Sequence, residues 1–204
     1  LHPADAFMSL WKELAPKMPK FQIRLVQLQE DLNSRNREYA MLGRSSDLIV
    51  GTFDSTTLKQ SFSAIQLGAY HFGIAVRSDN PLAQLDEIMY SDLAHRKVLM
   101  VSTGISEKND LVRSEMLAAD PSIQPIDTSG SYDINTFNET VEENIAMISL
   151  TPWKRIHPNL VTVPLKTSVT VPYGLLSTKF PGKKTADFLH EFTKLVPTET
   201  QSHS

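Results

Sequence analysis

The residues best suited to bind a ligand form a short turn that combines hydroxyl groups with a glycine: Ser102, Thr103, Gly104 and Ser106. The turn follows a run of β-forming residues and precedes a segment with helical spacing, so it lies where a strand ends and a helix begins. Free backbone N–H groups at the start of a helix attract anions, and a carboxylate would suit this position. Ser106 can also be the cap of its own helix, and the two roles are compatible. Ser129-Gly130-Ser131 is a second turn of the same kind, where a plain turn is the alternative.

Patterns typical of catalysis or metal binding are missing from the sequence. Glu30 and Asp31 are adjacent carboxylates in an expected turn, where solvation or helix capping explains them better than acid–base catalysis. The six histidines include no pair three or four residues apart, and the chain has no cysteine. No GxSxG, GxxxxGK or GxGxxG motif is present. We therefore expect no metal, no cofactor and no enzymatic activity.

Composition and charge are those of an ordinary globular protein, with 204 residues of which 41% are hydrophobic and 21% charged. The formal net charge of −3 argues against direct contact with DNA, because phosphate binding needs clustered Lys and Arg. No apolar run reaches the roughly 18 residues of a membrane span. The chain shows no apolar region of a signal peptide and opens on Leu1 rather than a methionine, so we expect a soluble domain whose true start is missing. A cytoplasmic location is also expected.

The first third of the chain predicts a helix followed by a strand–helix–strand unit. Phe7, Leu10, Trp11 and Leu14 have the spacing of an apolar helix face. Residues 21–28 and 47–53 are expected as strands, the second a central parallel one, around a helix over 32–42 that ends at Gly43 in the left-handed conformation. Alternating apolar residues from Tyr70 to Val76 predict a further strand, and the charged, proline-ended stretch 77–82 is expected to cross between two lobes.

The rest of the chain alternates between expected strands and helices. Strands are predicted over 97–102, 123–128, 144–150, 160–165 and 169–177, and helices near 91–93, over 107–119, from about 132 to 143, and over 183–195. In the helix 107–119, Leu111, Met116 and Leu117 are expected to face inward and Glu115 outward. Residues 166–168 are read as the return crossing. The fold class is therefore α/β, with two Rossmann-like lobes joined by two crossing strands.

Parallel sheets bind ligands beyond the carboxyl ends of their strands, and two lobes would place those ends on facing walls of a cleft. This rule selects a set of candidate binding residues: Gln29, Asp31, Thr52, Ser102, Thr103, Gly104, Ser106, Ser129, Ser131 and Thr151.

The ordered series of elements resembles the effector-binding domain of LysR-type transcriptional regulators. The resemblance rests on ELAPKMPKFQIRLVQL, AMLGRSSDLIVGTF, GIAVRSDNPLA, IMYSDLAHRKVLMVS and ENIAMISLTPW, and it covers nearly all of residues 3–196. It implies a periplasmic-binding-protein type II fold, with lobe I over 1–76 and 169–204 and lobe II over 77–168. It also implies effector contacts at Gln29, Asp31, Thr103 and Ser131.

The resemblance further implies a small-molecule effector such as an organic acid, a homodimer or higher homo-oligomer, and no membrane partner. DNA would be bound only through an N-terminal winged helix-turn-helix that this chain lacks. The chain departs from the family pattern at the opening strand, at the effector-binding Ser/Thr turn, and at Glu143-Asn144, which replaces small residues. An extracytoplasmic solute-binding protein of the same fold is the alternative function, and an enzyme on this fold is a third.

Overall fold

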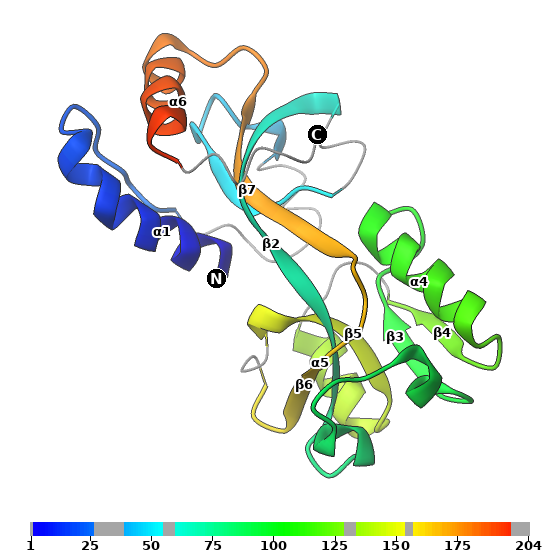
Figure 1. The fold of residues 1–204 in the computed structure, drawn as a ribbon. Helices are drawn as coiled ribbons and strands as arrows, with labels where there is room; N and C mark the ends of the chain where they lie inside the picture. The colour runs from blue at the N-terminus through cyan, green and yellow to red at the C-terminus, as the bar shows by residue number, and fades with distance from the viewer. Residues whose placement is uncertain (1, 27–38, 55–59, 129–133, 154–156, 197–204) are drawn as a thin grey trace. The chain divides into compact units, whose positions relative to one another are not determined.

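The computed structural model describes residues 2–26, 39–54, 60–128, 134–153 and 157–196. Figure 1 shows the helices and strands, which in chain order are α1 (His2–Leu14), β1 (Ile49–Thr52), β2 (Phe62–Arg77), β3 (Lys97–Met100), α4 (Glu107–Ala119), β4 (Gln124–Asp127), α5 (Ile134–Glu142), β5 (Ala146–Leu150), β6 (Leu160–Pro164), β7 (Thr170–Thr178) and α6 (Lys183–Leu195). Short 3-10 helices cover Ala15–Lys17, Pro81–Gln84, Tyr90–Leu93 and Thr151–Trp153. Among the described residues, every helix is too short or too polar to cross a membrane.

The chain divides into two compact units, one made of residues 1–69 and 172–204 and the other of residues 70–171. Both passages between the units fall inside long strands, β2 and β7, so two crossing strands join the units as expected. The stretch 77–82, expected as the first crossing, lies within the second unit. There Asn80 is buried, and its side-chain oxygen caps the 3-10 helix by accepting a hydrogen bond from the Leu82 N–H at 3.0 Å. β2 begins at Phe62, well before the alternation that predicted it. The prediction missed the first half of the strand because the residues there are only partly buried and their apolar pattern is weaker.

The sheet of the second unit has the strand order β6-β2-β5-β3-β4. β3 pairs in parallel with β4 and with β5, as the alternation of strands and helices predicted. β2 pairs antiparallel with β5 and with β6. The carboxyl ends of β3, β4 and β5 therefore meet at one edge of this sheet.

Helices cover both faces of this sheet, which makes the second unit a three-layer α/β/α structure. On one face Val98, Met100 and Ile148 pack in the same cluster as Val112 and Met116 of α4. On the other face Leu99 and Met147 pack with Phe137 of α5. Alternate strand residues thus serve opposite helices, which explains why β3 and β5 are apolar at almost every position.

An aromatic cluster between helices α1 and α6 holds the first unit together. Phe188 of α6 lies 5.8 Å from Trp11 of α1 and 5.5 Å from Phe192 between ring centroids. Phe7 of α1 also contacts Phe192, with the ring centroids 6.0 Å apart. Leu175 of β7 belongs to the same cluster, so the two helices pack on the sheet of this unit.

The sheet of the first unit has the strand order β1-β7-β2. β1 pairs antiparallel with β7. A strand does form within 47–53, but the prediction that it pairs in parallel is wrong for the partner that the structure describes. The strand predicted over 21–28 is also absent from its described part: residues 21–26 form no helix or strand, and Leu25 and Val26 are exposed. Only Phe21 and Ile23 pack on the core, too few inward residues to hold a strand in a sheet. Gly43, by contrast, has the expected left-handed conformation with φ +85°.

Candidate functional site

The carboxyl edge of the β3-β4-β5 sheet in the second unit collects the polar groups that could bind a ligand. Met100 of β3 pairs with Asp127 of β4, and Val98 pairs with Ala146 of β5, so the three strands end close to one another. The chain then leaves β3 through residues 101–106, β4 through Thr128 and β5 through Thr151. The sequence predicted this grouping because it depends only on the parallel order of these strands.

Ser102 joins the ends of β3 and β4 beyond the last sheet pairing. Its Oγ donates a hydrogen bond to the backbone oxygen of Thr128 at 2.6 Å, and the Thr128 N–H donates to the Met100 oxygen at 2.9 Å. Ser102 is half-buried, and its hydroxyl hydrogen is already engaged. Ser102 therefore shapes the edge of the sheet, and its remaining lone pairs are all it can offer a ligand.

Thr103 and Gly104 form the exposed tip of the turn. Gly104 has φ +89°, and no atom lies within 4 Å of the position that a Cβ would occupy, so backbone conformation rather than space requires glycine. The Gly104 N–H donates to the carboxylate of Asp110, with the shorter N···O distance 3.0 Å. The carboxylate that the turn binds here belongs to the protein's own helix α4, and binding of a ligand carboxylate at the turn stays a prediction.

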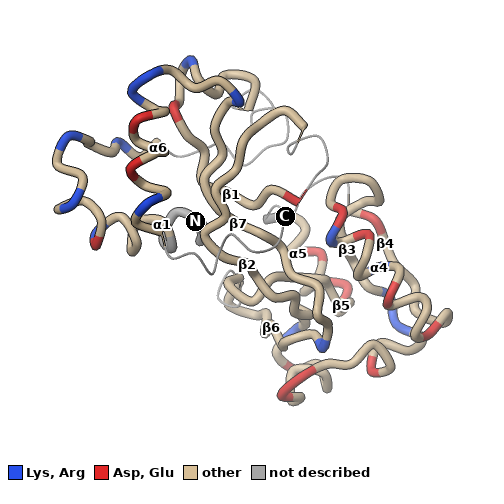
Figure 2. The backbone as a smooth tube through the Cα atoms, turned by 45° about the horizontal axis from the view of Figure 1, so that its top comes forward, with Lys and Arg blue, Asp and Glu red and all other residues tan. Residues whose placement is uncertain are grey.

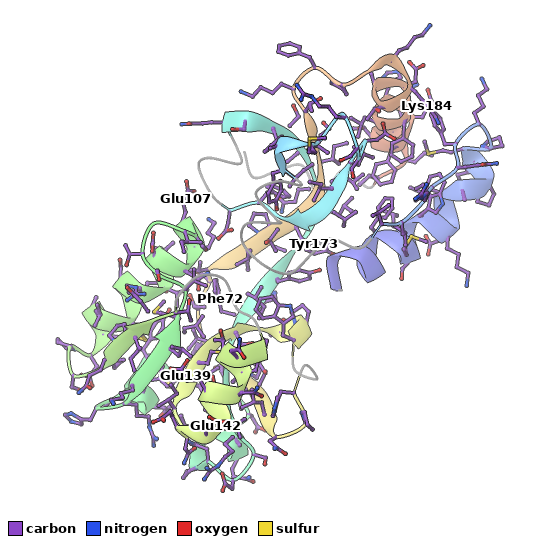
Figure 3. The ribbon with its side chains drawn as sticks, turned by 180° about the vertical axis from the view of Figure 1, so that it is seen from behind. Phe72, Glu107, Glu139, Glu142, Tyr173 and Lys184 are labelled. Atoms are coloured by element: carbon purple, nitrogen blue, oxygen red, sulfur yellow. The ribbon has the colours of Figure 1, made fainter. Side chains whose placement is uncertain are left out.

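Ser106 is the N-cap of α4. Its Oγ accepts hydrogen bonds from the Asn109 N–H at 3.0 Å and from the Asn109 side-chain amide at 2.8 Å. Ser106 is buried, and Glu107, labelled in Figure 3, is the first residue of the helix that follows. The capping role predicted for Ser106 is confirmed, while a role in ligand binding stays a prediction.

Arg113 of α4 brings a cation to this edge, although it was not among the candidate binding residues. Its Nη2 donates to the Val101 backbone oxygen at 3.0 Å and to Asp127 Oδ1 at 2.5 Å. The Arg113 side chain is 15% exposed, and its Nε is buried without a hydrogen-bond acceptor among the described residues. The one available signal was spacing, because Arg113 lies seven residues after the capping Ser106 and therefore on the same helix face.

Thr151 follows β5 and begins the 3-10 helix Thr151–Trp153. It is half-buried, and its hydroxyl makes no hydrogen bond within the described part of the chain. Trp153 packs against the hydrophobic clusters on this unit's sheet. Thr151 and the more exposed Thr103 are therefore the two candidate hydroxyls at this edge that are available to a ligand.

Hydrogen bonds from Tyr90 and Thr167 to Glu115 join α4 to two other segments of the second unit. Tyr90 Oη and Thr167 Oγ1 both donate to Oε2 of Glu115, at 2.7 Å and 2.9 Å. Burial raises the pKa of the Tyr90 phenol, and the hydrogen bond to the Glu115 carboxylate acts in the same direction.

The prediction that Glu115 points outward is wrong, since it is half-buried in this cluster. Leu111 and Leu117, which were expected to face inward, are 45% and 37% exposed. Met116 faces the sheet as predicted, and Val112 faces it in place of Leu111, since residues one position away on a helix are turned by about 100°.

The remaining predicted residues are less informative. Thr52 lies at the end of β1 in the first unit, opposite Tyr173 of the antiparallel strand β7, so the rule for parallel strand ends does not apply to it. Gln29, Asp31, Ser129 and Ser131 lie outside the described residues. Within the described ranges, no group of three or more His, Cys, Asp or Glu side chains could hold a metal ion.

No protein-family model matches this sequence, and no curated protein matches it. Solved structures with the same fold do match. The LysR family transcriptional regulator CbnR superposes with a TM-score of 0.66 at 13% identity, over 94% of this chain and 65% of CbnR. The effector-binding domain of QuiR in complex with shikimate gives 0.62 at 17% identity, over 98% of this chain and 90% of QuiR.

A transport protein matches equally well. The probable amino-acid ABC transporter extracellular-binding protein ytmK from Bacillus subtilis gives a TM-score of 0.65 at 15% identity, over 96% of this chain and 83% of ytmK. The parallel strands and paired crossings seen here thus occur in both kinds of protein. The chain has the periplasmic-binding-protein type II fold, in the form found in the effector-binding domains of LysR-type regulators.

Proposed function

We propose that this chain is the effector-binding domain of a LysR-type transcriptional regulator. It binds a small metabolite and thereby controls DNA binding by an N-terminal winged helix-turn-helix that is not part of this sequence. The observation that carries the proposal is the carboxyl edge shared by β3, β4 and β5, where the Thr103 and Thr151 hydroxyls make no hydrogen bond within the described residues and Arg113 reaches the end of β3. The matches to regulatory domains, one of them in complex with shikimate, support it at the level of the fold.

The chemistry of this edge favours a small organic acid. Hydroxyl donors and a guanidinium bind carboxylates well, and the Gly104 N–H already binds the carboxylate of Asp110. We expect the effector to contact Ser102, Thr103 and Thr151 on this wall, and to lie between the two lobes as the sequence predicted. The ligand shifts the equilibrium between two arrangements of the regulator only to the extent that it binds one arrangement more tightly than the other.

A thermal-shift screen of hydroxy acids, dicarboxylates and amino acids, with shikimate included, tests the proposal. A ligand that binds only the folded chain raises the melting temperature, and the shift grows with ligand concentration. Thr103→Val and Thr151→Val should abolish the shift, whereas Thr193→Val on the exposed face of α6 should leave it intact. Absence of a shift with every compound, or a shift that survives both site variants, would contradict the proposed site.

An extracytoplasmic solute-binding protein is the second candidate, and the match to ytmK favours it. Such proteins use the same fold to bind solutes, so a bound amino acid would not by itself decide between the two functions. The codons upstream of this segment do decide. A helix-turn-helix there supports the regulator, and a signal peptide or lipobox supports the transport protein. In either case no enzymatic activity is part of the proposal.

A further inference from the structure

Phe180 is the most exposed apolar side chain of the described residues, with 93% of its surface accessible, against 61% for the next, Val26. It lies in the short connection between β7 and α6, in the sequence Lys-Phe-Pro-Gly-Lys-Lys. A single exposed apolar residue is ordinary on a protein surface. An aromatic ring left almost wholly in water is not, because aromatic residues are enriched at protein interfaces.

Four cations accompany Phe180 on this surface: Arg44, Lys179, Lys183 and Lys184. None of them makes an ion pair or side-chain hydrogen bond with the described residues, although the protein as a whole is acidic with a net charge of −3. Figure 2 shows basic residues at the amino-terminal end of α6, and Figure 3 labels Lys184 there. Two carboxylates lie near the four cations: Asp47, which accepts a hydrogen bond from Thr185 at 3.2 Å, and Asp187, three residues after Lys184 on α6. The surface therefore carries a local excess of uncompensated positive charge.

The same surface is hollowed beside the ring. A shallow depression of ≈ 450 Å³, open to solvent, is lined by Leu42, Gly43, Arg44, Ser61, Thr178 and Phe180, among others. A smaller hollow of ≈ 200 Å³ adjoins it through Gly43, Thr178 and Gly182 and reaches Lys183 and Lys184. All of these residues belong to the first unit, and none is in the carboxyl edge proposed to bind the effector.

We propose that this surface, made of Arg44, Lys179, Phe180, Lys183 and Lys184, is a docking site for an acidic segment of a partner protein. One apolar side chain of the segment enters the hollow and packs on Phe180, and flanking carboxylates pair with the four cations. The hollow favours a protein segment over other acidic partners. A flat anionic bilayer or a phosphate backbone would use the charges but leave the hollow beside the ring unfilled.

Selection of displayed random peptides on the purified chain tests this docking site. Enriched peptides should combine several Asp or Glu residues with one large apolar residue, and fluorescence polarisation then measures the affinity of the best of them. Phe180→Ala should weaken binding about tenfold, as removal of a central aromatic anchor does. Lys183→Glu with Lys184→Glu should weaken it to a similar extent and reduce its dependence on salt. Lys12→Glu with Lys17→Glu makes the same change of charge at exposed lysines elsewhere and should alter the affinity less than about twofold.

Several outcomes would overturn the docking site. They are a failure to enrich peptides, enriched peptides without an acidic bias, or affinities that Phe180→Ala and the paired lysine variant leave unchanged. Binding of phosphatidylglycerol vesicles or of duplex DNA that is lost in Phe180→Ala would assign the surface to a different class of partner. Association of the chain with itself through these residues, seen by sedimentation, would replace the partner protein with a second copy. Because Phe180 is exposed, its variant should keep the wild-type melting temperature, so lost binding cannot be attributed to unfolding.

Discussion

Arg113 of α4 and Asp127 at the end of β4 form an ion pair across the carboxyl edge of the second unit, with Nη2 and Oδ1 2.5 Å apart. The same Nη2 donates to the Val101 backbone oxygen, so one guanidinium joins a helix to the ends of two neighbouring strands. The arrangement holds the edge that is proposed to bind the effector. It also leaves the Arg113 Nε inside the structure without an acceptor among the described residues, a polar group that a rearrangement or a ligand could satisfy.

Arg113→Met should lower the free energy of unfolding by about 1–2 kcal/mol, because it removes charge-assisted hydrogen bonds at a mostly buried guanidinium. Urea denaturation measures the loss. Arg77→Met is the matched control, since Arg77 pairs with Asp79 at 2.6 Å at the surface, where water and salt screen an ion pair and its contribution to stability is small. Equal losses in the two variants would show that Arg113 is not a structural link.

Ser106→Ala should lower the free energy of unfolding by about 1 kcal/mol, because the Asn109 N–H loses its capping oxygen. Urea denaturation again provides the measurement. Ser114→Ala is the control on the same helix. Ser114 is exposed and donates to the Asp110 backbone oxygen, so alanine there should be neutral or slightly stabilising. If the two serine variants have the same free energy of unfolding, the Ser106 cap does not contribute to stability.

Much of the fold could be predicted from the sequence where local signals agree. The bounds of α4 and α6 match the prediction, because Ser106 caps one helix and Pro181-Gly182 precedes the other. Burial on both sheet faces made β3 and β5 continuous apolar runs that are easy to recognise. The antiparallel pairing of β1 could not be predicted, because strand direction depends on partners distant in sequence such as β7.

The candidate site could be predicted only to the level of backbone position. The order of parallel strands placed Ser102, Thr103 and Thr151 at one edge, and the structure of the second unit bears out that placement. Arg113 and Glu115 were missed because their partners, Asp127, Tyr90 and Thr167, come from other elements. Charged residues on a helix read as solvated surface unless the tertiary contacts are known.

Gly104→Ala should lower the free energy of unfolding by about 1 kcal/mol although space is available for its Cβ, because an alanine at φ +89° is strained. Gly104→Asn should be milder, since asparagine tolerates the left-handed region better, and Gly104→Val should be the most destabilising. Melting temperatures of the three variants measure the order. Equal losses for asparagine and valine would contradict an origin in backbone conformation.

Tyr90→Phe should change how the stability depends on alkaline pH. Burial raises the pKa of the Tyr90 phenol above its ordinary value of 10.0, so the folded protein keeps this proton after the unfolded chain has lost it. More protons are then bound in the folded state, and the contribution of Tyr90 is fully present below pH 10.0 and declines as the pH rises above that value. At neutral pH the variant should be less stable by about 1 kcal/mol through loss of the hydrogen bond to Glu115. Urea titrations at neutral pH and at several values above pH 10 should show the two proteins converging, whereas a constant difference would mean that the phenol is not held neutral by the fold.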